Sequence, residues 1–181
     1  MKKDLFYLDL FRYYGEKGEN KKQKRNRPKE LEYIRVYRKL QSKLNFFSKR
    51  YYKKKLRRLS TITNIQIPYS TQIGEGFYIG HCGTIIINPR AVLGKNINIT
   101  AGVTIGQENR GERKGCPTIG NNCWIGTNAV IVGNITIGND VLIAPLAYVN
   151  CDVPDHSIVI GNPAKIIYRE NATRDYINNV V

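Results

Sequence analysis

An aliphatic residue returns every six positions through the middle of this chain, and no other feature limits the fold as strongly. The phase is constant apart from a two-residue shift after Ile79 and a loop at residues 107–118. The members of the series are Ile67, Ile73, Ile79, Ile87, Leu93, Ile99, Ile105, Ile119, Ile125, Ile131, Ile137, Ile143 and Val149. A helix would need a period of 3.6 and an exposed strand strict alternation, so a period of six excludes both.

A second inward position lies four residues after each aliphatic. It holds small or apolar residues, namely Thr71, Gly83, Ala91, Ile97, Val103, Cys123, Ala129, Ile135, Val141 and Ala147. Six residues make one short strand and a turn, so three such units close a coil of about 18 residues. Because a single coil cannot bury its apolar side, only stacked coils are stable. The sequence therefore predicts an all-β fold, a parallel β-helix of slightly more than four coils.

The net charge of +15 lies entirely in the first third of the chain. Residues 1–60 hold 21 Lys and Arg against six Asp and Glu, whereas residues 61–181 hold eight of each. We therefore expect three parts: a basic helical segment at 1–60, the β-helix at 61–168 and a polar tail at 169–181. The tail is expected to be a short helix or disordered.

The basic segment predicts two helices. Asp4 is a suitable N-cap for a helix at residues 5–14, and Gly15 would end it. A polar linker at 15–27 follows, and Pro28 suits the first turn of a second helix that ends near residues 53–58. One apolar stripe with helical spacing is predicted along it, made of Leu31, Ile34, Tyr37, Leu40, Leu44, Phe47 and Tyr51.

Three interpretations of this segment stay open. Its apolar stripe packs on the β-helix while its charges are solvated, or it contacts an anionic membrane or an acidic glycan. Nucleic-acid binding is disfavoured because no recognition motif accompanies the charge.

Cysteine usage and the start of the chain favour a cytoplasmic protein. Four cysteines, Cys82, Cys116, Cys123 and Cys151, show no CxxC spacing, and Cys123 falls on an inward position. Charges interrupt the start before an apolar run develops, so we expect no signal peptide, and no apolar stretch is long enough to span a membrane. Peripheral contact with the inner membrane face remains an alternative.

His81 is the candidate catalytic residue. It stands two residues after the inward Ile79 and therefore outside the core, whereas Cys82 points elsewhere, which disfavours a Cys–His nucleophile pair. An imidazole ordinarily titrates near neutral pH, so it can accept a proton from a hydroxyl. His156, in a Pro-Asp-His-Ser turn, is interpreted as structural. Two histidines are too few for a three-histidine zinc site, so no metal is expected.

The ladder, the turn Gly80-His81-Cys82-Gly83-Thr84 and the ending Gly161-Asn162-Pro163-Ala164-Lys165 resemble the hexapeptide-repeat acyltransferases. Serine acetyltransferases and sugar O-acetyltransferases of surface-polysaccharide clusters are similar over about residues 63–168. The resemblance implies a left-handed β-helix, a homotrimer with active sites between subunits, acetyl-CoA as donor, and His81 as general base.

Departures from the serine enzymes bear on the acceptor. Those enzymes carry an aspartate before the catalytic histidine and another fifteen residues upstream, where this chain has Gly80 and Gln66. Their loop carries an Arg-His pair where Gly115 and Cys116 stand here. These losses favour a hydroxyl of a polysaccharide sugar, or of its precursor, over free serine. Serine O-acetylation, N-acetylation of an amino sugar and a non-catalytic scaffold remain alternatives.

The resemblance also implies a cofactor site. Thr127 and Pro145 match positions that line the pantetheine groove, and Lys165 matches a phosphate-binding residue. Asn150 stands where such enzymes have a threonine, Arg169 is expected to replace a lost arginine at Tyr168, and Trp124 would pack on the thiol end of the cofactor or between subunits.

The loop at 107–118 is the other candidate site element, since loops that break a regular scaffold tend to carry function. Arg110, Arg113 and Lys114 would bind an acidic acceptor or CoA phosphates, with simple solvation as the alternative. Glu108 or Glu112 from a neighbouring subunit, or a backbone carbonyl, would orient His81.

Overall fold

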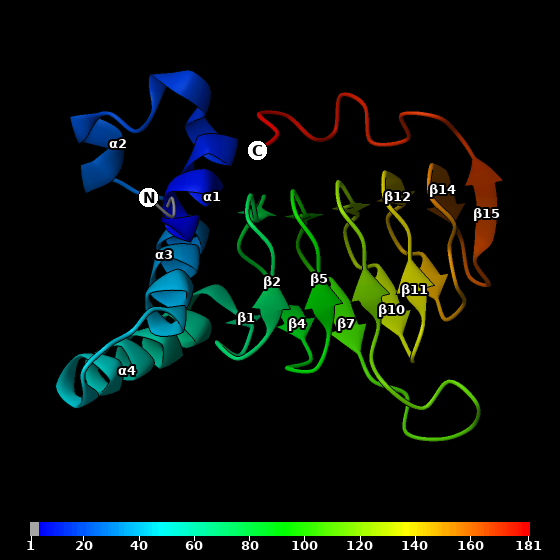
Figure 1. Ribbon diagram of the computed structural model, residues 1–181, viewed down its shortest axis with the longest axis horizontal. Coiled ribbons are helices and arrows are strands. Elements are labelled where there is room, and N and C mark those ends of the chain that lie inside the picture. Colours follow the sequence, from blue (N-terminus) through cyan, green and yellow to red (C-terminus); the bar gives the residue numbers. More distant parts are fainter. Residues whose placement is uncertain (1–3) are drawn as a thin grey trace.

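The computed structural model describes residues 4–181, which form a helical end and a long parallel β-helix (Figure 1). The expectation that the chain starts without a signal peptide rests partly on residues 1–3, which lie outside this range. The helical end comprises α1 (Leu5–Tyr14), the 3-10 turn η1 (Gly15–Lys17), α2 (Lys21–Arg25), α3 (Lys29–Gln41) and α4 (Phe46–Thr63). Within residues 4–181, no helix is both long and apolar enough to cross a membrane.

Three sheets form the sides of the β-helix. The first sheet contains β1 (Ile65–Gln66), β4 (Ile85–Ile87), β7 (Thr104–Gly106), β10 (Val130–Val132) and β13 (Tyr148–Val149). The second contains β2 (Gln72–Ile73), β5 (Val92–Leu93), β8 (Thr118–Ile119) and β11 (Thr136–Ile137). The third contains β3 (Tyr78–Ile79), β6 (Asn98–Ile99), β9 (Trp124–Ile125), β12 (Val141–Ile143), β14 (Ser157–Ile160) and β15 (Lys165–Tyr168). All neighbours pair in parallel except β14 and β15, which form an antiparallel hairpin.

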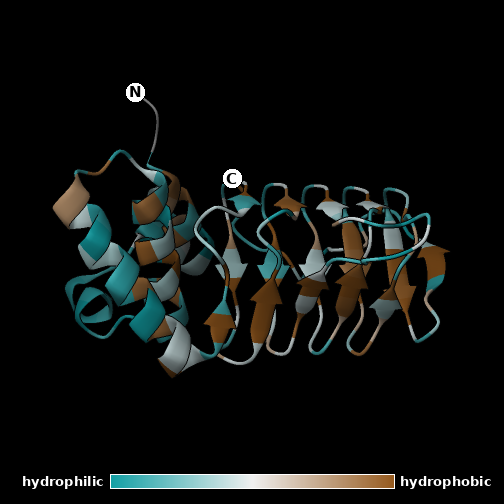
Figure 2. Cartoon of the chain, turned by 90° about the horizontal axis from the view of Figure 1, so that it is seen from below, coloured by the Kyte–Doolittle hydropathy of each residue, from teal (hydrophilic) through white to brown (hydrophobic). Residues whose placement is uncertain are grey.

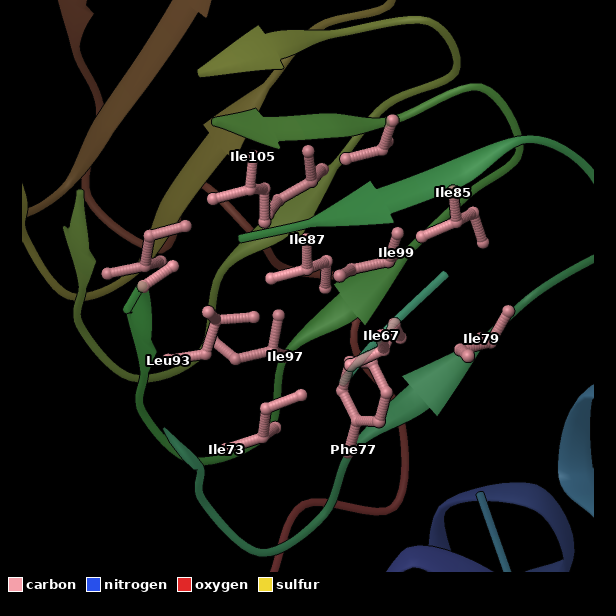
Figure 3. Close-up of a cluster of buried hydrophobic side chains, with 14 of the residues drawn as sticks. Ile67, Ile73, Phe77, Ile79, Ile85, Ile87, Leu93, Ile97, Ile99 and Ile105 are labelled. Atoms are coloured by element: carbon pink, nitrogen blue, oxygen red, sulfur yellow. The ribbon is translucent and has the colours of Figure 1, made fainter. Parts of the chain in front are cut away.

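The six-residue ladder forms the core, as predicted. Ile79, Ile99 and Ile125 are stacked in register on the third sheet and are fully buried. Figure 3 shows such side chains pointing inward from neighbouring coils, with Phe77 among them. The first sheet has five rungs, the number that its ladder positions Ile67, Ile87, Ile105, Ile131 and Val149 predict.

Strand register shows where the two interruptions lie. Val130 pairs with Tyr148, a coil of 18 residues, whereas Ile65 pairs with Ile85, a coil of 20. The coil from Thr104 to Val130 has 26 residues because it contains the loop. Both interruptions are thus extra residues in a turn, and the core continues past them unchanged.

The first predicted helix is confirmed and the second is wrong in extent. The Asp4 side chain accepts a bond from the Phe6 N–H at 3.1 Å, and Gly15 ends α1 with φ of 59°. The second helix is in fact two helices. Ser42 is extended, and the Asn45 side chain caps a new helix by accepting from the Ser48 N–H at 2.9 Å.

This break also corrects the predicted apolar stripe. The part on α3 is buried, but Phe47 and Tyr51 on α4 are 81% and 60% exposed, because the chain changes direction between the helices. The linker is also not wholly irregular, since η1 and α2 form within it and Asn20 and Gln23 make a capping box.

Side chains of α1 and α3 cap the open end of the β-helix. The Tyr33 hydroxyl both donates to the Ile67 carbonyl and accepts from the Ile67 N–H, each at 3.0 Å. Tyr13 makes the same pair of bonds with Ile79. A terminal coil exposes an unpaired strand edge, which invites pairing with another chain, and these bonds occupy that edge.

The C-terminal tail is neither a helix nor disordered. It turns after β15 and runs back along the third sheet to α1 (Figure 1). The Asp140 carboxylate accepts from the N–H groups of Ala172 and Thr173, both at 3.0 Å. At the far end, the Val181 N–H donates to the Asn96 side chain at 3.0 Å.

Candidate active site

His81 lies in the two-residue insertion that breaks the ladder. The Gly80 N–H donates to the Ile99 carbonyl at 2.9 Å, so Gly80 pairs with Thr100 in the next coil. Gly83 then lies against Ala101, so close that a Cβ on Gly83 would lie 2.8 Å from the Ala101 Cβ. His81 and Cys82 therefore have no counterpart in the next coil. Both are exposed, as the outward position of His81 predicted.

The corner that carries His81 continues as a straight edge along the β-helix. The Asn128 N–H donates to the Ala101 carbonyl and the Leu146 N–H to the Thr127 carbonyl, so Ala101, Thr127 and Pro145 succeed one another. Thr127 and Pro145 are exposed there. One coil adds one strand spacing, so Thr127 lies roughly 10 Å from the bulge and Pro145 roughly 14 Å. The structure thus places the candidate base and both predicted pantetheine residues on one edge.

Helix α3 contacts this corner. The Cys82 thiol donates to a carboxylate oxygen of Glu30, in the first turn of α3, at 3.1 Å. Partial loss of hydration around the thiol, together with this carboxylate, raises the pKa of Cys82 to about 11, so the thiol stays neutral at neutral pH. A nearby carboxylate from α3 was not foreseen, since nothing in the spacing of the sequence joins Glu30 to a turn fifty residues later.

The two positions where serine enzymes carry aspartates, Gln66 and Gly80 here, both have room for a side chain. Gln66 is exposed on β1, beside Ile86 on β4. A Cβ on Gly80 would lie 3.7 Å from the Tyr78 ring, an ordinary contact, so a side chain fits there. Neither site is closed by packing.

A depression of about 610 Å³ lies between α4 and the outer face of the first sheet. Gln66 and Ile86 line it from the strands, and Lys53 and Arg57 from α4. Its size lies in the range of small-molecule sites. Two cations and no carboxylate line it, so it suits an anionic group.

Within one chain, the remaining predicted cofactor residues lie on different edges of the β-helix. Lys165 begins β15 next to the edge of Pro145, and its partner across the hairpin is Ile160. Arg169 lies past the other end of β15, where its N–H donates to the His156 carbonyl at 2.7 Å. Asn150 follows β13 at the corner between the first and second sheets, the corner that also carries the loop. All three side chains are exposed.

Trp124 faces outward on β9, as the repeat predicts, and is partly buried by the chain's own tail. Its ring packs edge-on against Tyr176 with centroids 4.8 Å apart. Its predicted contact with the cofactor stays a prediction.

The loop is tied down at its base and exposed at its tip. Glu108 and Gly115 exchange backbone hydrogen bonds of 2.9 and 3.0 Å, and the Asn134 N–H donates to the Arg113 carbonyl at 2.8 Å. Arg110, Arg113 and Lys114 are exposed. The loop extends beyond the body of the β-helix (Figure 1), on the opposite edge of the first sheet from His81. One chain alone does not bring these cations to His81.

Among residues 4–181, no group of three or more His, Cys, Asp or Glu side chains is placed to hold a metal ion.

A family model, bacterial transferase hexapeptide (six repeats), matches residues 116–151. Serine acetyltransferase 2 of Arabidopsis thaliana is 34% identical over 134 residues, which are 68% of this chain and 42% of that protein. The resemblance to the hexapeptide-repeat acyltransferases is confirmed.

Similar solved structures agree with this family resemblance. Serine acetyltransferase of Brucella abortus in complex with coenzyme A is 25% identical with a TM-score of 0.74, covering 91% of this chain and 67% of that one. The Neisseria gonorrhoeae enzyme in complex with serine is 28% identical with a TM-score of 0.67, covering 90% and 66%. The chain spans between 38% and 64% of the length of the curated relatives it matches.

Proposed function

We propose that this hexapeptide-repeat chain transfers an acetyl group from acetyl-CoA to a hydroxyl, with His81 as the general base. The observation that supports it most is the bulge itself. It holds an exposed imidazole at one end of an edge on which Thr127 and Pro145 also lie. Lys165, at the far end of that edge, is a suitable partner for the cofactor phosphates.

The reaction follows from this arrangement. His81 accepts the proton of the acceptor hydroxyl while the oxygen forms a bond to the thioester carbon. The tetrahedral intermediate then collapses as the carbon–sulfur bond breaks, and the departing thiolate takes the proton back from the imidazolium. Backbone N–H groups of the turn are suited to stabilise the oxyanion.

Serine is the acceptor that the relatives favour. The curated relatives are named serine acetyltransferases, and one similar structure is a complex with serine. The expectation of a polysaccharide sugar has no support among them, and neither has contact with an acidic glycan or an anionic membrane. Gly80 and Gln66 still remove two carboxylates from the site, so serine would be held by other groups, and Glu30, bonded to Cys82 next to His81, is one candidate.

The site is proposed to be completed by a second subunit. His81 and the loop cations lie on opposite edges of the first sheet, and a threefold assembly would place the loop of one chain against the His81 edge of the next. Homotrimers are what the family resemblance implies.

An acceptor screen tests the proposal. Purified protein with acetyl-CoA should release free thiol when serine is added, and less with a panel of neutral sugars and amino sugars. Transfer to a sugar alone would replace serine as acceptor. If no acceptor is acetylated and CoA leaves the melting temperature unchanged, the chain is a scaffold rather than an enzyme.

A further inference from the structure

The outward face of α4 is strongly basic. The helix carries Lys49, Arg50, Lys53, Lys54, Lys55, Arg57 and Arg58 and no acidic residue. Leu56, Leu59 and Thr63 bury the opposite face, so Arg50, Lys54 and Arg58 point away from the body. In Figure 1, α4 lies at the end of the molecule far from β15, and Figure 2 shows this helical end as mainly hydrophilic.

Within residues 4–181, six of these seven cations lack a carboxylate partner, and only Lys55 forms an ion pair, at 2.7 Å from Glu32. A shallow depression of about 500 Å³ runs along the same face, lined by Phe46, Lys49, Arg50, Lys53, Lys54 and Arg57. Uncompensated like charges at this spacing repel one another, so the face costs stability unless an anion covers it.

Large aromatic side chains lie at the start of this basic face. Phe46, Phe47 and Tyr51 are 74%, 81% and 60% exposed. The rings of Phe46 and Phe47 pack edge-on with centroids 5.6 Å apart, so they form one apolar projection. Clustered exposed apolar groups on a soluble domain mark a contact surface.

We propose that α4 docks this protein on an anionic lipid membrane, with Phe46 and Phe47 in the headgroup region and the cations over the lipid phosphates. Two contributions favour such binding. The cations are attracted to the negative surface potential of the membrane, and the aromatic rings insert at the interface between water and lipid. Contact with a second copy through this face is opposed by charge, since a twofold contact would place one cationic helix on another. Binding of a single-stranded nucleic acid is disfavoured, because its bases stack on separate aromatic rings and Phe46 and Phe47 pack against each other.

Vesicle flotation tests this inference independently of the acetyl transfer. Full-length protein should float with phosphatidylglycerol-containing vesicles and not with pure phosphatidylcholine vesicles, and salt should release it. Replacing Lys49, Arg50, Lys54 and Arg58 by Gln should weaken partitioning on the order of a hundredfold, since each cation near the surface contributes to the attraction. Phe46→Ser with Phe47→Ser should weaken it while leaving the net charge unchanged.

A matched control removes the same charge elsewhere. Lys21, Lys22, Lys24 and Arg25 are exposed on or beside α2, and their replacement by Gln changes net charge equally. This control should keep most of the binding. Equal losses in both charge variants would overturn the assignment to α4. So would binding to single-stranded DNA without vesicle binding, or a change of oligomeric state in the α4 variant without vesicle binding.

Discussion

At the residue scale, the bulge separates His81 from the packing that fixes its neighbours. Gly80 is bonded to the next coil and Gly83 to Thr63 at the end of α4, whereas the two residues between them project from the corner. An exposed imidazole on a fixed backbone can meet both an acceptor and a thioester. Because no core side chain rests on it, replacing His81 should affect chemistry without affecting folding.

His81→Ala should therefore lower turnover by about 10²- to 10⁴-fold, the usual contribution of a general base. The melting temperature should stay within the error of the wild-type value. His156→Ala is the matched control, since it removes the other histidine, which lies at a different corner. Unchanged turnover in His81→Ala would disprove the assignment.

Gly80→Asp tests the acceptor. The position has room for a side chain, and the substitution restores a carboxylate next to His81. If serine is the acceptor, the new carboxylate should bind its ammonium group and lower KM for serine about tenfold, as expected for a hydrogen bond to a charged group. Gly80→Asn, which has the same shape without charge, should give a smaller change. A KM that does not differ among the three proteins would count against serine.

At the element scale, the helices serve the β-helix as an end cap. The bonds from Tyr33 and Tyr13 satisfy backbone groups that no neighbouring coil can reach, and they fix α1 and α3 to the first coil. The same contact carries Glu30 to Cys82. The end cap therefore protects a strand edge and also forms part of the candidate site.

Tyr33→Phe should lower the free energy of unfolding by about 1–3 kcal/mol, because it leaves the buried N–H and carbonyl of Ile67 without partners. Urea unfolding measures the change. Tyr51→Phe is the control, since Tyr51 is 60% exposed and should have almost no effect. Equal stability of the two variants would show that the cap bonds contribute nothing.

The pair of His156 and Asp140 should stabilise the folded chain at low pH. The bond to Asp140 at 2.9 Å raises the pKa of His156 above its ordinary 6.5, so this contribution is complete below pH 6.5 and is lost as pH rises through the raised value. Trp124, the single tryptophan, packs on Tyr176, so its fluorescence reports unfolding.

We expect the free energy of unfolding in urea, followed by Trp124 emission, to fall as pH rises above 6.5. His156→Gln should flatten this dependence, and Asp140→Asn should lower the stability at every pH. A stability that does not fall above pH 6.5 in the wild type would contradict the coupling.

The sequence predicted the β-helix and the place of His81 because both follow from a periodic pattern and its interruption. It missed the break at Ser42 because apolar residues at helical spacing continue across it, and only the Asn45 cap marked a new helix. It also missed the docked tail, whose bonds come from Asp140 on one coil and from Asn98 and Asn96 on another. Contacts that depend on stacking order leave no local signal in the sequence.

At the scale of the whole molecule, one chain does not assemble a complete candidate site. The loop cations and His81 lie at opposite edges of the first sheet, and Asn150 lies on the loop side. A trimer would join the two edges, and light scattering should give a mass of three chains.

Mixed trimers test whether sites are shared. A His81→Ala chain and a chain with Arg110, Arg113 and Lys114 replaced by Gln should each have low activity. When the two are refolded together, sites that pair an intact loop with an intact His81 should restore part of the turnover. Mixing the folded variants without exchange of subunits should restore none. If refolded mixtures gain no activity although mass spectrometry finds mixed trimers, the loop acts within its own chain or has no catalytic role.

The corner edge has a further consequence, which concerns length. From the bulge to Lys165 the distance is set by how many coils lie between them, and each coil adds roughly 5 Å. Each repeat of 18 residues, such as that from Thr127 to Pro145, therefore adds a fixed length to this edge as well as one layer to the core. Gaining or losing one repeat would preserve the core and change only the reach between base and cation. The fold can thus accommodate acyl donors of different length by gaining or losing whole coils, while the bulge with His81 and the hairpin with Lys165 stay the same.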